Sequence, residues 1–440
     1  MPTENAHQRY LAELPNSWSI CDLRALGSIV GGSTPSRAIS RFWNGNIPWV
    51  TPGEMTALVG TKFLNDTRER ITRAGYESCG TRLLPPSSLL ITTRATLGLV
   101  ALAGCEVSTN QGFKSVVFCR DNYPDFYFHL FHRLKPEMER LASGTTFLEI
   151  SAGDFGRITI PVPPPSEQRA IAAVLDTIDD AIQKTEQIIA KLQQVKQGLL
   201  HDLLTRGIDD NGELRDPERH PEQFQDSPLG RIPKGWRLVR LRDVATKIAD
   251  RDHTTPRYVD DGILMVSPTN LSGEEDIDFI ACRRIPLVDH RENRKKTDIE
   301  VGDLIIHRIG AGLGAIREVN DSMPEFSILH SMAMIRISRS RTTAAFVRWA
   351  LRSSAVQGQM GLGTQSIGVP DLGLDKIGSL EFYLPENSEQ LAIASVLDTL
   401  VRRIEEEAVA REKLQQMRRG ISDDLLTGRV RTTSLPGFSA

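Results

Sequence analysis

The sequence predicts a mixed α/β protein built as two tandem units, each consisting of a globular block followed by a long amphipathic helix. Three observations support this fold class: an internal repeat, heptad-like apolar spacing in both repeated segments, and short apolar runs separated by turn residues elsewhere. The expected boundaries are 1–165 for the first block, 166–207 for the first helix, 208–230 for an acidic linker, 231–384 for the second block, 385–430 for the second helix and 431–440 for a C-terminal tail.

The internal repeat is the strongest signal in the chain. Residues 166–182 align without gaps to residues 388–404, and 11 of the 17 positions are identical. The same offset of 222 also matches Asp-Leu-Leu-Thr at 202–205 with 424–427. The blocks repeat more weakly, for example at Trp18 and Trp236. In this duplication the helical segments keep their sequence whereas the globular blocks diverge, which implies that the two parts have different tasks.

The repeated segments are expected to form long helices. Proline at 161 and 163–165 prevents a helix just upstream, and Ser166 is a suitable N-cap. In the first segment, the residues expected on the inner apolar stripe are Ile171, Val174, Ile178, Ile188, Leu192 and Val195. In the second segment they are Ile393, Val396, Leu400, Leu414 and Met417, with the stripe leaning through Leu397 and Ile404.

Such helices need a partner. From residue 167 to residue 204 the first would be about 57 Å long at a rise of 1.5 Å per residue. A helix with one apolar stripe is not stable alone in water. We therefore expect the two copies to form an antiparallel, pseudo-two-fold pair between the globular blocks. The alternative is that each helix packs on its own block.

The globular blocks combine strands, helices and long loops. The runs expected as strands are 89–91, 115–118, 304–306 and 332–337, and the stretches expected as helices are 124–140 and 344–351. The linker at 208–230 holds seven acidic and two basic residues, and we interpret it as a solvated connection.

Composition sets the broad class. The 440 residues are 40% hydrophobic and 25% charged, as in globular proteins of two to three domains. No apolar run is long enough for a membrane span. The five cysteines are far apart and never form C-x-x-C, which favours a reduced, cytoplasmic protein without a disulfide framework or zinc site. The net charge of −3 is dominated by the acidic linker, so a polyanionic partner is permitted.

No catalytic residues are predicted. The Gly-rich stretch at 304–314 follows a strand, but residues 315–319 resemble another strand, so a tight hairpin is favoured over a cofactor loop. The sequence has neither a Walker A loop nor the Asn/Asp-Pro-Pro-aromatic motif of amino-methyltransferases. His129 and His132 lie three apart without acidic or Cys companions, so we do not expect a metal site there.

Recognition of nucleic acid is the remaining chemistry. Both blocks carry Arg, Lys, Asn, Gln and Thr side chains in or near loop-like stretches, which suit phosphates and base edges. The candidates are Thr34, Arg37, Lys62, Arg70, Arg94, Asn110, Gln111, Thr145 and Thr146 in the first block, and Thr255, Arg257, Asn270, Lys295, Arg308, Thr364 and Gln365 in the second. For any one of them, a solvated surface residue is the alternative.

The layout resembles the specificity subunit of type I restriction-modification systems. The resemblance is carried by two divergent blocks, each followed by a Pro-rich turn, a Ser-Glu-Gln opening, an Ala-Val-Leu-Asp-Thr-like core at 173–177 and 395–399, and a Leu-Leu-Thr ending. It implies a subunit without its own catalysis, in a bacterial or archaeal cytoplasm, whose two blocks are target recognition domains. Each would read one half of a split, asymmetric double-stranded DNA target.

The resemblance also implies partners. The helices, whose stripe residues would serve as subunit interface as well as helix pair, would dock two modification subunits, which bring S-adenosylmethionine and methylate adenine. Restriction subunits using ATP and Mg would translocate and cleave DNA. This subunit would itself bind no cofactor and no metal. Two other classes stay open on the residues alone: a self-contained methyltransferase or nuclease, and a helical adaptor without a DNA role.

Overall fold

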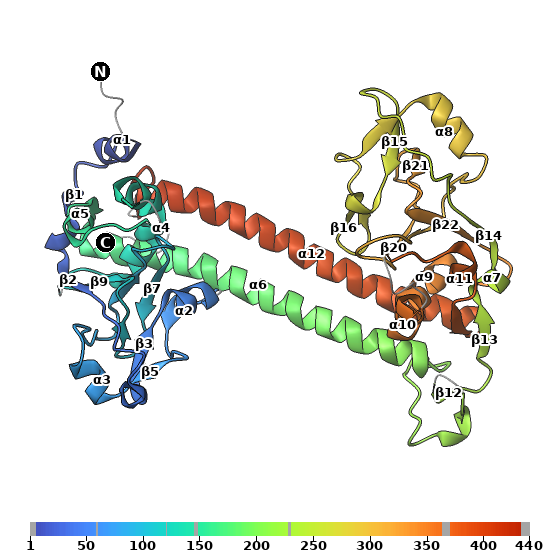
Figure 1. Cartoon of the computed structure of the whole chain (residues 1–440), viewed down its shortest axis with the longest axis horizontal. Helices are drawn as coiled ribbons and strands as arrows, with labels where there is room; N and C mark the ends of the chain where they lie inside the picture. The colour runs from blue at the N-terminus through green and yellow to red at the C-terminus, as the bar shows by residue number, and fades with distance from the viewer. Residues whose placement is uncertain are drawn as a thin grey trace. The chain divides into compact units, whose positions relative to one another are not determined.

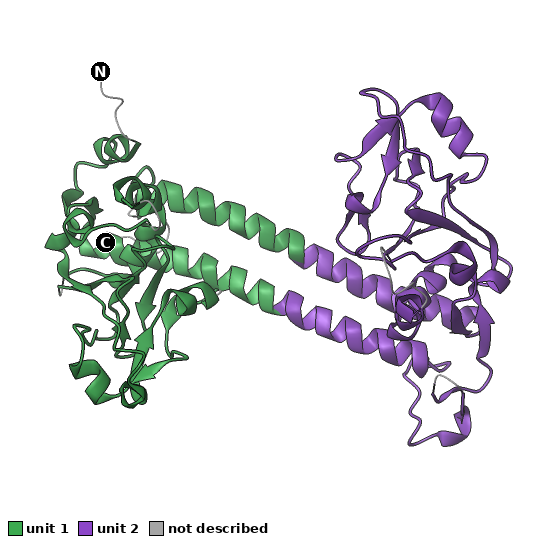
Figure 2. Ribbon diagram, viewed as in Figure 1, with its two compact units in different colours: residues 1–187, 408–440 green, residues 188–407 purple. Residues whose placement is uncertain are grey.

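The computed structural model describes residues 6–58, 60–119, 121–144, 148–227, 230–362 and 370–432. The chain divides into two compact units, and the division crosses both long helices (Figure 2). Unit 1 comprises residues 1–187 and 408–440, and unit 2 comprises residues 188–407. Each unit therefore contains one globular block together with part of each long helix.

The block of unit 1 holds three small sheets (Figure 1). The strands in their sheet order are β1 (Ser19–Asp22) with β10 (Thr159–Val162); β2 (Gly27–Gly31), β9 (Lys114–Phe118), β6 (Leu89–Ile91), β7 (Val100–Ala103) and β4 (Phe63–Leu64); and β5 (Arg70–Ile71), β3 (Trp43–Val50) and β8 (Ser108–Thr109). The helices are α1 (Ala6–Ala12), α2 (Pro52–Ala57), α3 (Arg73–Glu77), α4 (Pro124–Leu141) and α5 (Ala152–Gly156), with 3-10 turns at Leu23–Ala25 and Ser40–Phe42.

Unit 2 repeats this topology. Its sheets are β13 (Arg237–Arg240) with β23 (Glu381–Leu384); β14 (Ala245–Ala249), β22 (Met332–Ile337), β19 (Leu304–His307) and β20 (Ile316–Glu318); and β18 (Arg283–Ile285), β15 (Ile263–Val266) and β21 (Phe326–Ile328). Two further pairs are β11 (Phe224–Gln225) with β12 (Ile232–Pro233) and β16 (Leu271–Ser272) with β17 (Asp276–Ile277). The helices are α7 (Leu241–Val244), α8 (Leu287–Asn293), α9 (Ala344–Arg352), α10 (Ser354–Leu362) and α11 (Leu374–Gly378), with 3-10 turns at Pro221–Gln223 and Pro268–Asn270.

The predicted block elements are confirmed. All four strand runs lie within β6, β9, β19 and β22, and the two helical stretches are α4 and α9. The Gly-rich stretch is a hairpin, because β19 pairs antiparallel with β20. The glycines at 310, 312 and 314 all have positive φ, which explains why the turn needs them.

The two long helices are α6 (Pro165–Thr205) and α12 (Asn387–Leu426). A glycine with positive φ lies two residues beyond the end of each helix: Gly207 after α6 and Gly428 after α12. Glycine is the residue that this helix-ending conformation favours, because it lacks a Cβ. The repeat therefore encodes both ends of the helix.

The helices pair antiparallel within each unit. In unit 1, Leu175 near the start of α6 shares a core with Leu425 near the end of α12. In unit 2, Leu203 near the end of α6 shares a core with Leu397 near the start of α12. Both cores also include block residues, so each helix contacts the other helix and the block together.

The predicted inner stripe is partly wrong. Ile171 and Ile393 are buried, and Val174, Ile178, Leu192, Leu400 and Leu414 are partly buried. The side chains that lie outside the helix core are Ile188, 45% exposed, Val195, 42%, Val396, 41%, and Met417, 55%. The stripe through Leu397 and Ile404 is confirmed, since Leu397 is buried and Ile404 is partly buried.

A buried lysine explains the error in α6. The second inner row runs one residue later than expected, through Leu175, Ile182, Ile189, Lys196 and Leu203. Lys196 is 4% exposed, and its ammonium pairs with the Glu274 carboxylate. A charge at this position made the row look interrupted, so the adjacent row of Ile188 and Val195 was favoured instead.

The Ser-Glu-Gln opening of each helix is a structural clamp. Glu167 accepts a hydrogen bond from Trp18 Nε1 at 2.9 Å and pairs with Arg431 at 2.7 Å. Glu389 likewise accepts from Trp236 Nε1 at 3.0 Å and pairs with Arg215. The start of each long helix is thus held by an arginine from the segment that follows the other long helix.

The adjoining glutamine also has the same role twice. Gln168 donates to the Pro163 carbonyl at 2.9 Å, and its Oε1 accepts the Tyr123 N–H at the start of α4. Gln390 donates to the Pro385 carbonyl at 2.9 Å, and its Oε1 accepts from Thr342 just before α9. These bonds fix the long helix to the block helix in each unit.

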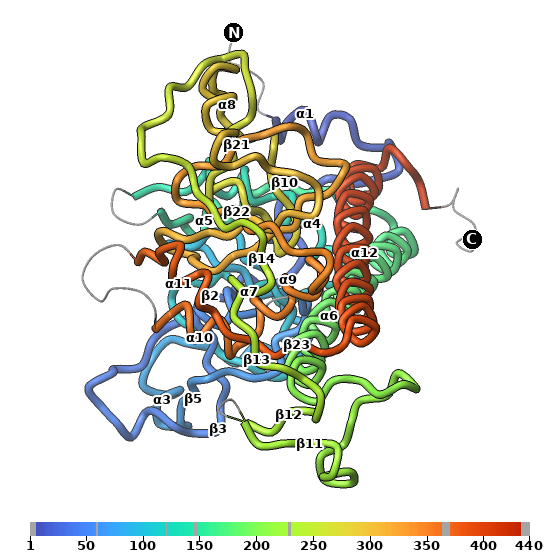
Figure 3. The backbone as a smooth tube through the Cα atoms, turned by 90° about the vertical axis from the view of Figure 1, so that its right-hand side faces the viewer, coloured from blue at the N-terminus to red at the C-terminus, as the bar shows by residue number. Residues whose placement is uncertain are grey.

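The segment at 208–230 is more than a solvated connection. Ile208 is buried in the main core of unit 2, and Arg215 binds Glu389. Further along, β11 and β12 lie side by side as a short antiparallel pair (Figure 3). Sequence composition alone did not reveal these anchors, because acidic and turn residues dominate the segment.

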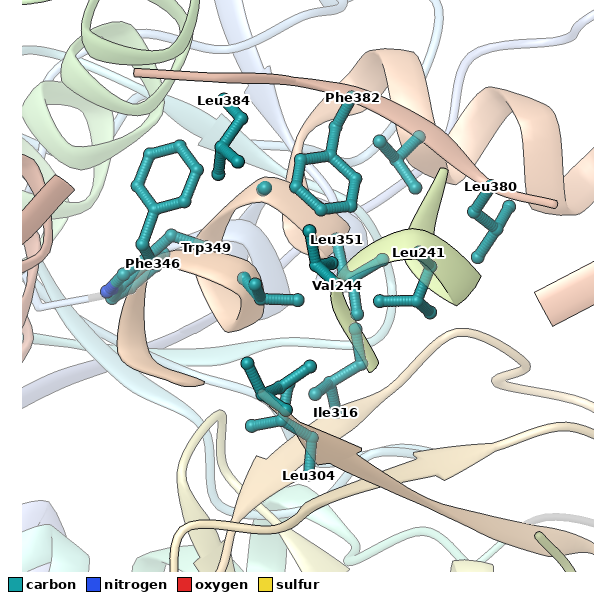
Figure 4. Packing of buried hydrophobic residues seen from close by; sticks show 14 of the residues in the cluster. Leu241, Val244, Leu304, Ile316, Phe346, Trp349, Leu351, Leu380, Phe382 and Leu384 are labelled. Carbon is teal, nitrogen blue, oxygen red and sulfur yellow. The ribbon is translucent and has the colours of Figure 1, made fainter. Parts of the chain in front are cut away.

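The core of unit 2 joins the elements around α9. Phe346, Trp349 and Leu351 of α9 lie among side chains from α7, β19, β20 and the β23 segment (Figure 4). Phe126 occupies the third position of α4 in unit 1, as Phe346 does in α9, and both are fully buried. The repeated topology is therefore supported by equivalent core positions.

Candidate nucleic-acid interface

Two loops of unit 1 bring three predicted residues together. Thr34 follows β2, and its hydroxyl donates to Oε1 of Gln111 in the loop between β8 and β9. Asn110 in the same loop accepts the Gly112 N–H at 2.9 Å. The backbones lie so close that a Cβ on Gly32 would be 2.0 Å from the Asn110 carbonyl oxygen. Amide and hydroxyl groups are thus held together beside the sheet.

Arg37 extends this polar group. Its guanidinium lies 3.9 Å from the Trp43 ring centroid and 5.2 Å from that of Trp49. Two hydrogen bonds join it to Glu69, and they raise the pKa of Arg37. Trp49 donates to the Ser33 carbonyl at 3.0 Å, which ties this aromatic support to the loop of Thr34. The arrangement presents an exposed, oriented guanidinium on a rigid base.

The other predicted cations of this block also have carboxylate neighbours. Arg70 pairs with Asp66. Arg94 lies 3.5 Å from Glu149, whose other oxygen is 3.6 Å from Lys114. All of these side chains except that of Lys114 are more than a third exposed, so these pairs exchange readily with other ligands. Thr145 and Thr146 lie outside the described residues.

Lys62 has a different role from the one expected. Its ammonium pairs with Asp125 of α4 and, at 2.7 Å, with Asp176 of α6. Asp176 also binds His129 Nε2 at 2.8 Å. Burial raises the pKa of the Asp176 carboxyl, but the hydrogen bonds from His129 and Lys62 outweigh it and hold that pKa below its usual range. Lys62 and His129 therefore attach the block to α6.

Two predicted residues of unit 2 line one cavity. Thr255 and Arg257 lie on the wall of a cavity of about 250 Å³, which α8 also lines with Asp289 and Glu292. Arg257 is 3.7 Å from Asp289. Lys295 lies beside this region and pairs with Glu292 at 2.6 Å, with both side chains exposed. The structure therefore collects Thr255, Arg257 and Lys295 around α8.

Asn270 and Arg308 are structural residues rather than exposed readers. The buried Asn270 accepts from the Ser267 N–H at 2.9 Å and so caps a 3-10 turn. The buried Arg308 binds Asp250 at 3.1 Å and Asp371 at 2.8 Å. Residue type alone cannot separate these tasks, since caps and buried ion pairs use the same side chains. Thr364 and Gln365 lie outside the described residues.

Sequence reasoning missed three side chains on this side of unit 2. Arg251 lines the same cavity as Thr255. Tyr258 and Arg283 line a neighbouring cavity of about 430 Å³, and the Arg283 guanidinium lies 4.8 Å from the Tyr258 ring centroid. Their positions depend on the sheet β18-β15-β21 and the loop after β14, so no local pattern indicated them.

Comparison with known proteins agrees with this arrangement. Residues 15–194 match the family described as the type I restriction modification DNA specificity domain. The MjaVIII specificity subunit of Methanocaldococcus jannaschii is 21% identical over 444 residues, which cover 98% of this chain and 97% of the relative. The chain is thus similar to type I restriction specificity subunits, in residues 15–194 to the family and over nearly its whole length to one relative. Its repeated blocks and paired helices are the architecture of a specificity subunit.

Other relatives match over shorter regions. The MjaIX specificity subunit of the same archaeon is 29% identical over 237 residues, about half the length of each chain. The EcoR124I/EcoR124II specificity subunit of Escherichia coli is 29% identical over 164 residues, 36% of this chain and 40% of the relative. The crystal structure of a type I S subunit from M. genitalium has the same fold, with a TM-score of 0.57 and 14% identity over 94% of this chain and 97% of that one.

Several site types are not present in the described part of this chain. Within it, no three His, Cys, Asp or Glu side chains are grouped so that they could hold a metal ion. None of the helices searched there has the length and apolar character needed to cross a bilayer. All five cysteines are free.

Proposed function

We propose that this chain recognises a bipartite, asymmetric double-stranded DNA target, with the block of each unit reading one half-site. The observation that carries the proposal is one topology used twice with different loop chemistry. Unit 1 presents Arg37 with Thr34 and Gln111, and unit 2 presents Arg257 with Thr255. Guanidinium, amide and hydroxyl groups are those that contact phosphates and base edges.

The proposal includes partner subunits. Two modification subunits carry S-adenosylmethionine and methylate adenine, and restriction subunits supply ATP-driven translocation and cleavage with Mg. This chain contributes recognition and no catalysis. Half-sites that face the same side of B-DNA are favoured at a separation of about one helical turn, or about 10 base pairs.

Methylation mapping tests the DNA target. The full chain is expressed with the modification subunits of its own system in a host without other methyltransferases, and the methylome is sequenced. The expected motif has two short specific parts separated by unspecified bases. A single continuous motif, or methylation without sequence preference, would contradict the proposal. Fusing the unit 1 block to the unit 2 block of a relative should change only one half of the motif.

We propose that the apolar side chains left outside the helix core contribute to docking the modification subunits, Met417 within unit 1 and the other three within unit 2. Val195 and Val396 are exposed, as are Ile188 and Met417. An exposed apolar stripe on a helix favours a protein partner. This accounts for positions that the pairing of α6 and α12 does not use.

Co-purification tests this surface. Val195→Asp combined with Met417→Asp should leave the chain folded and reduce capture by tagged modification subunits at least tenfold. The matched control is Leu192→Ser, at a half-buried inner position, which should lower stability without removing the exposed stripe. Undiminished capture of the doubly substituted, folded chain would exclude these side chains from the interface.

A further inference from the structure

The buried Arg251 of unit 2 has unmet hydrogen-bond donors and no ion-pair partner within the described residues. Arg251 follows β14 and is 6% exposed. Its Nη2 donates to the Thr254 hydroxyl at 2.9 Å, but Nε and Nη1 are buried without a hydrogen-bond partner. Burying a guanidinium whose N–H groups have no acceptor lowers the free energy of unfolding. We therefore expect this arginine to serve a function.

The charges around Arg251 are already engaged. Asp252 pairs with Lys296, Asp289 lies 3.7 Å from Arg257, and Glu292 pairs with Lys295. No ion pair joins any of these carboxylates to Arg251 within the described structure. Burial lowers the pKa of Arg251, although it remains a strong base. The cavity of about 250 Å³ is therefore lined by a guanidinium that has no direct carboxylate partner.

Neutral donor side chains lie beside Arg251 in this cavity, and the carboxylates in its wall, Asp289 and Glu292, have Arg257 and Lys295 as partners. Thr254, Thr255 and Asn293 line the same cavity. The Thr254 hydroxyl accepts a hydrogen bond from Arg251. Two unused N–H groups on one guanidinium match the acceptors of a phosphate or the O6 and N7 of guanine. The sheet strand β15 contributes Met265 to the wall, which gives the site a rigid base.

Other buried arginines show that this state is unusual in the unit. Arg317 is 4% exposed and binds the carbonyls of Gly273 at 2.7 Å and Asp276 at 3.0 Å. Arg308 is equally buried and has two carboxylate partners. Both of these guanidinium groups are held by several acceptors of the fold, whereas Arg251 has one acceptor and leaves Nε and Nη1 without a partner.

We infer that Arg251 is a DNA-contacting residue of the second block, whose guanidinium binds acceptor atoms of the duplex in the cavity beside Thr254 and Thr255. The inference rests on the proposed function. The acceptors come either from a backbone phosphate or from the edge of a guanine, and these two sources have different consequences. A phosphate contact acts on all sequences alike, whereas a guanine contact acts at one position of one half-site.

The test uses the full chain assembled with its modification subunits. Arg251→Gln is titrated with duplexes carrying the mapped motif and with duplexes changed at each position, over a range of salt concentrations. Binding should weaken about 5- to 150-fold. Uniform weakening with a salt slope reduced by about 1 identifies a phosphate, and loss of preference at one position of one half-site identifies a guanine.

Arg317→Gln is the matched control. It should lower thermal stability, because it leaves buried carbonyls without donors, while DNA affinity per folded complex stays unchanged. Arg251→Gln should keep the thermal midpoint of the wild type or raise it. If folded Arg251→Gln binds every duplex as the wild type does, the inference is overturned. If the wild-type complex itself prefers no sequence, the proposed function fails instead.

Discussion

The two units solve the same structural problem with different side chains. In unit 1, Asp176 of α6 is bound by His129 and Lys62. In unit 2, Asp398 of α12, at the repeat offset of 222, is bound by Trp349 Nε1 at 2.7 Å and by Arg348. The helix carboxylate is retained, and the block that approaches it has diverged.

This comparison distinguishes the residues that hold the long helices, which are retained, from the residues of the exposed loops, which differ. The retained residues hold a long helix to its block: Glu167 and Glu389, Gln168 and Gln390, and the aspartates above. The loops differ in charge compensation, since Arg37 is bonded to Glu69 whereas Arg251 has no carboxylate partner. A fixed scaffold allows the loops of the two blocks to change independently.

The largest expected effect tests whether the two cores are equivalent. Phe126→Ala and Phe346→Ala should each cost about 3–5 kcal/mol, because both remove a fully buried ring. Denaturant titration followed by circular dichroism should show one early transition in each variant. A loss below about 1 kcal/mol for only one variant would break the equivalence of the units.

The helix clamps should respond more moderately. Glu167→Gln and Glu389→Gln should each cost about 1.5–3 kcal/mol at pH 7, because each removes charged hydrogen bonds to an arginine and a tryptophan. Chemical denaturation of both variants measures this. Unchanged stability in both would mean that the clamps do not hold the helix ends.

The pH dependence of stability tests the clamp at Glu167. Burial raises the pKa of this carboxyl, but hydrogen bonds from Arg431 and Trp18 outweigh it and leave the pKa below its ordinary 4.5. Its contribution is therefore complete above that value and is lost as the pH falls through the lower folded pKa. Between pH 6 and pH 3 the wild type should lose more stability than Glu167→Gln. Parallel pH profiles would contradict this assignment.

The smallest effects are expected outside the helix core. Ile188→Ser in unit 2 and Met417→Ser in unit 1 should each change the stability of the free chain by about 0.5 kcal/mol or less, since both side chains are about half exposed. Ile189→Ser, one residue along, should cost several times more because Ile189 is buried. Equal costs at 188 and 189 would restore the originally expected stripe.

The sequence predicted what local periodicity and repetition encode. The long helices, α4, α9 and the β19–β20 hairpin follow from spacing, capping and glycine positions. The inner stripe of α6 was misplaced because Lys196 interrupts it, and its partner Glu274 is distant in sequence. Long-range pairing is not visible in a local pattern.

The candidate interface was predicted less completely for the same reason. Thr34 and Gln111 are separate candidates by residue type, and only the structure joins them by a hydrogen bond. Asn270 caps a turn and Lys62 joins a buried ion pair, tasks for which the fold uses the same side chains as a DNA contact would. Arg251 had no distinguishing sequence context, and only its burial without a partner marks it.

The clamp at Glu167 has a consequence for biosynthesis. Unit 2 is continuous in sequence, whereas unit 1 needs residues 408–440 as well as residues 1–187. Arg431 and Leu425 are synthesised after the whole of unit 2, so the apolar start of α6 has neither contact until α12 has been made. A chain that lacked the last turn of α12 would therefore leave this apolar face of α6 exposed.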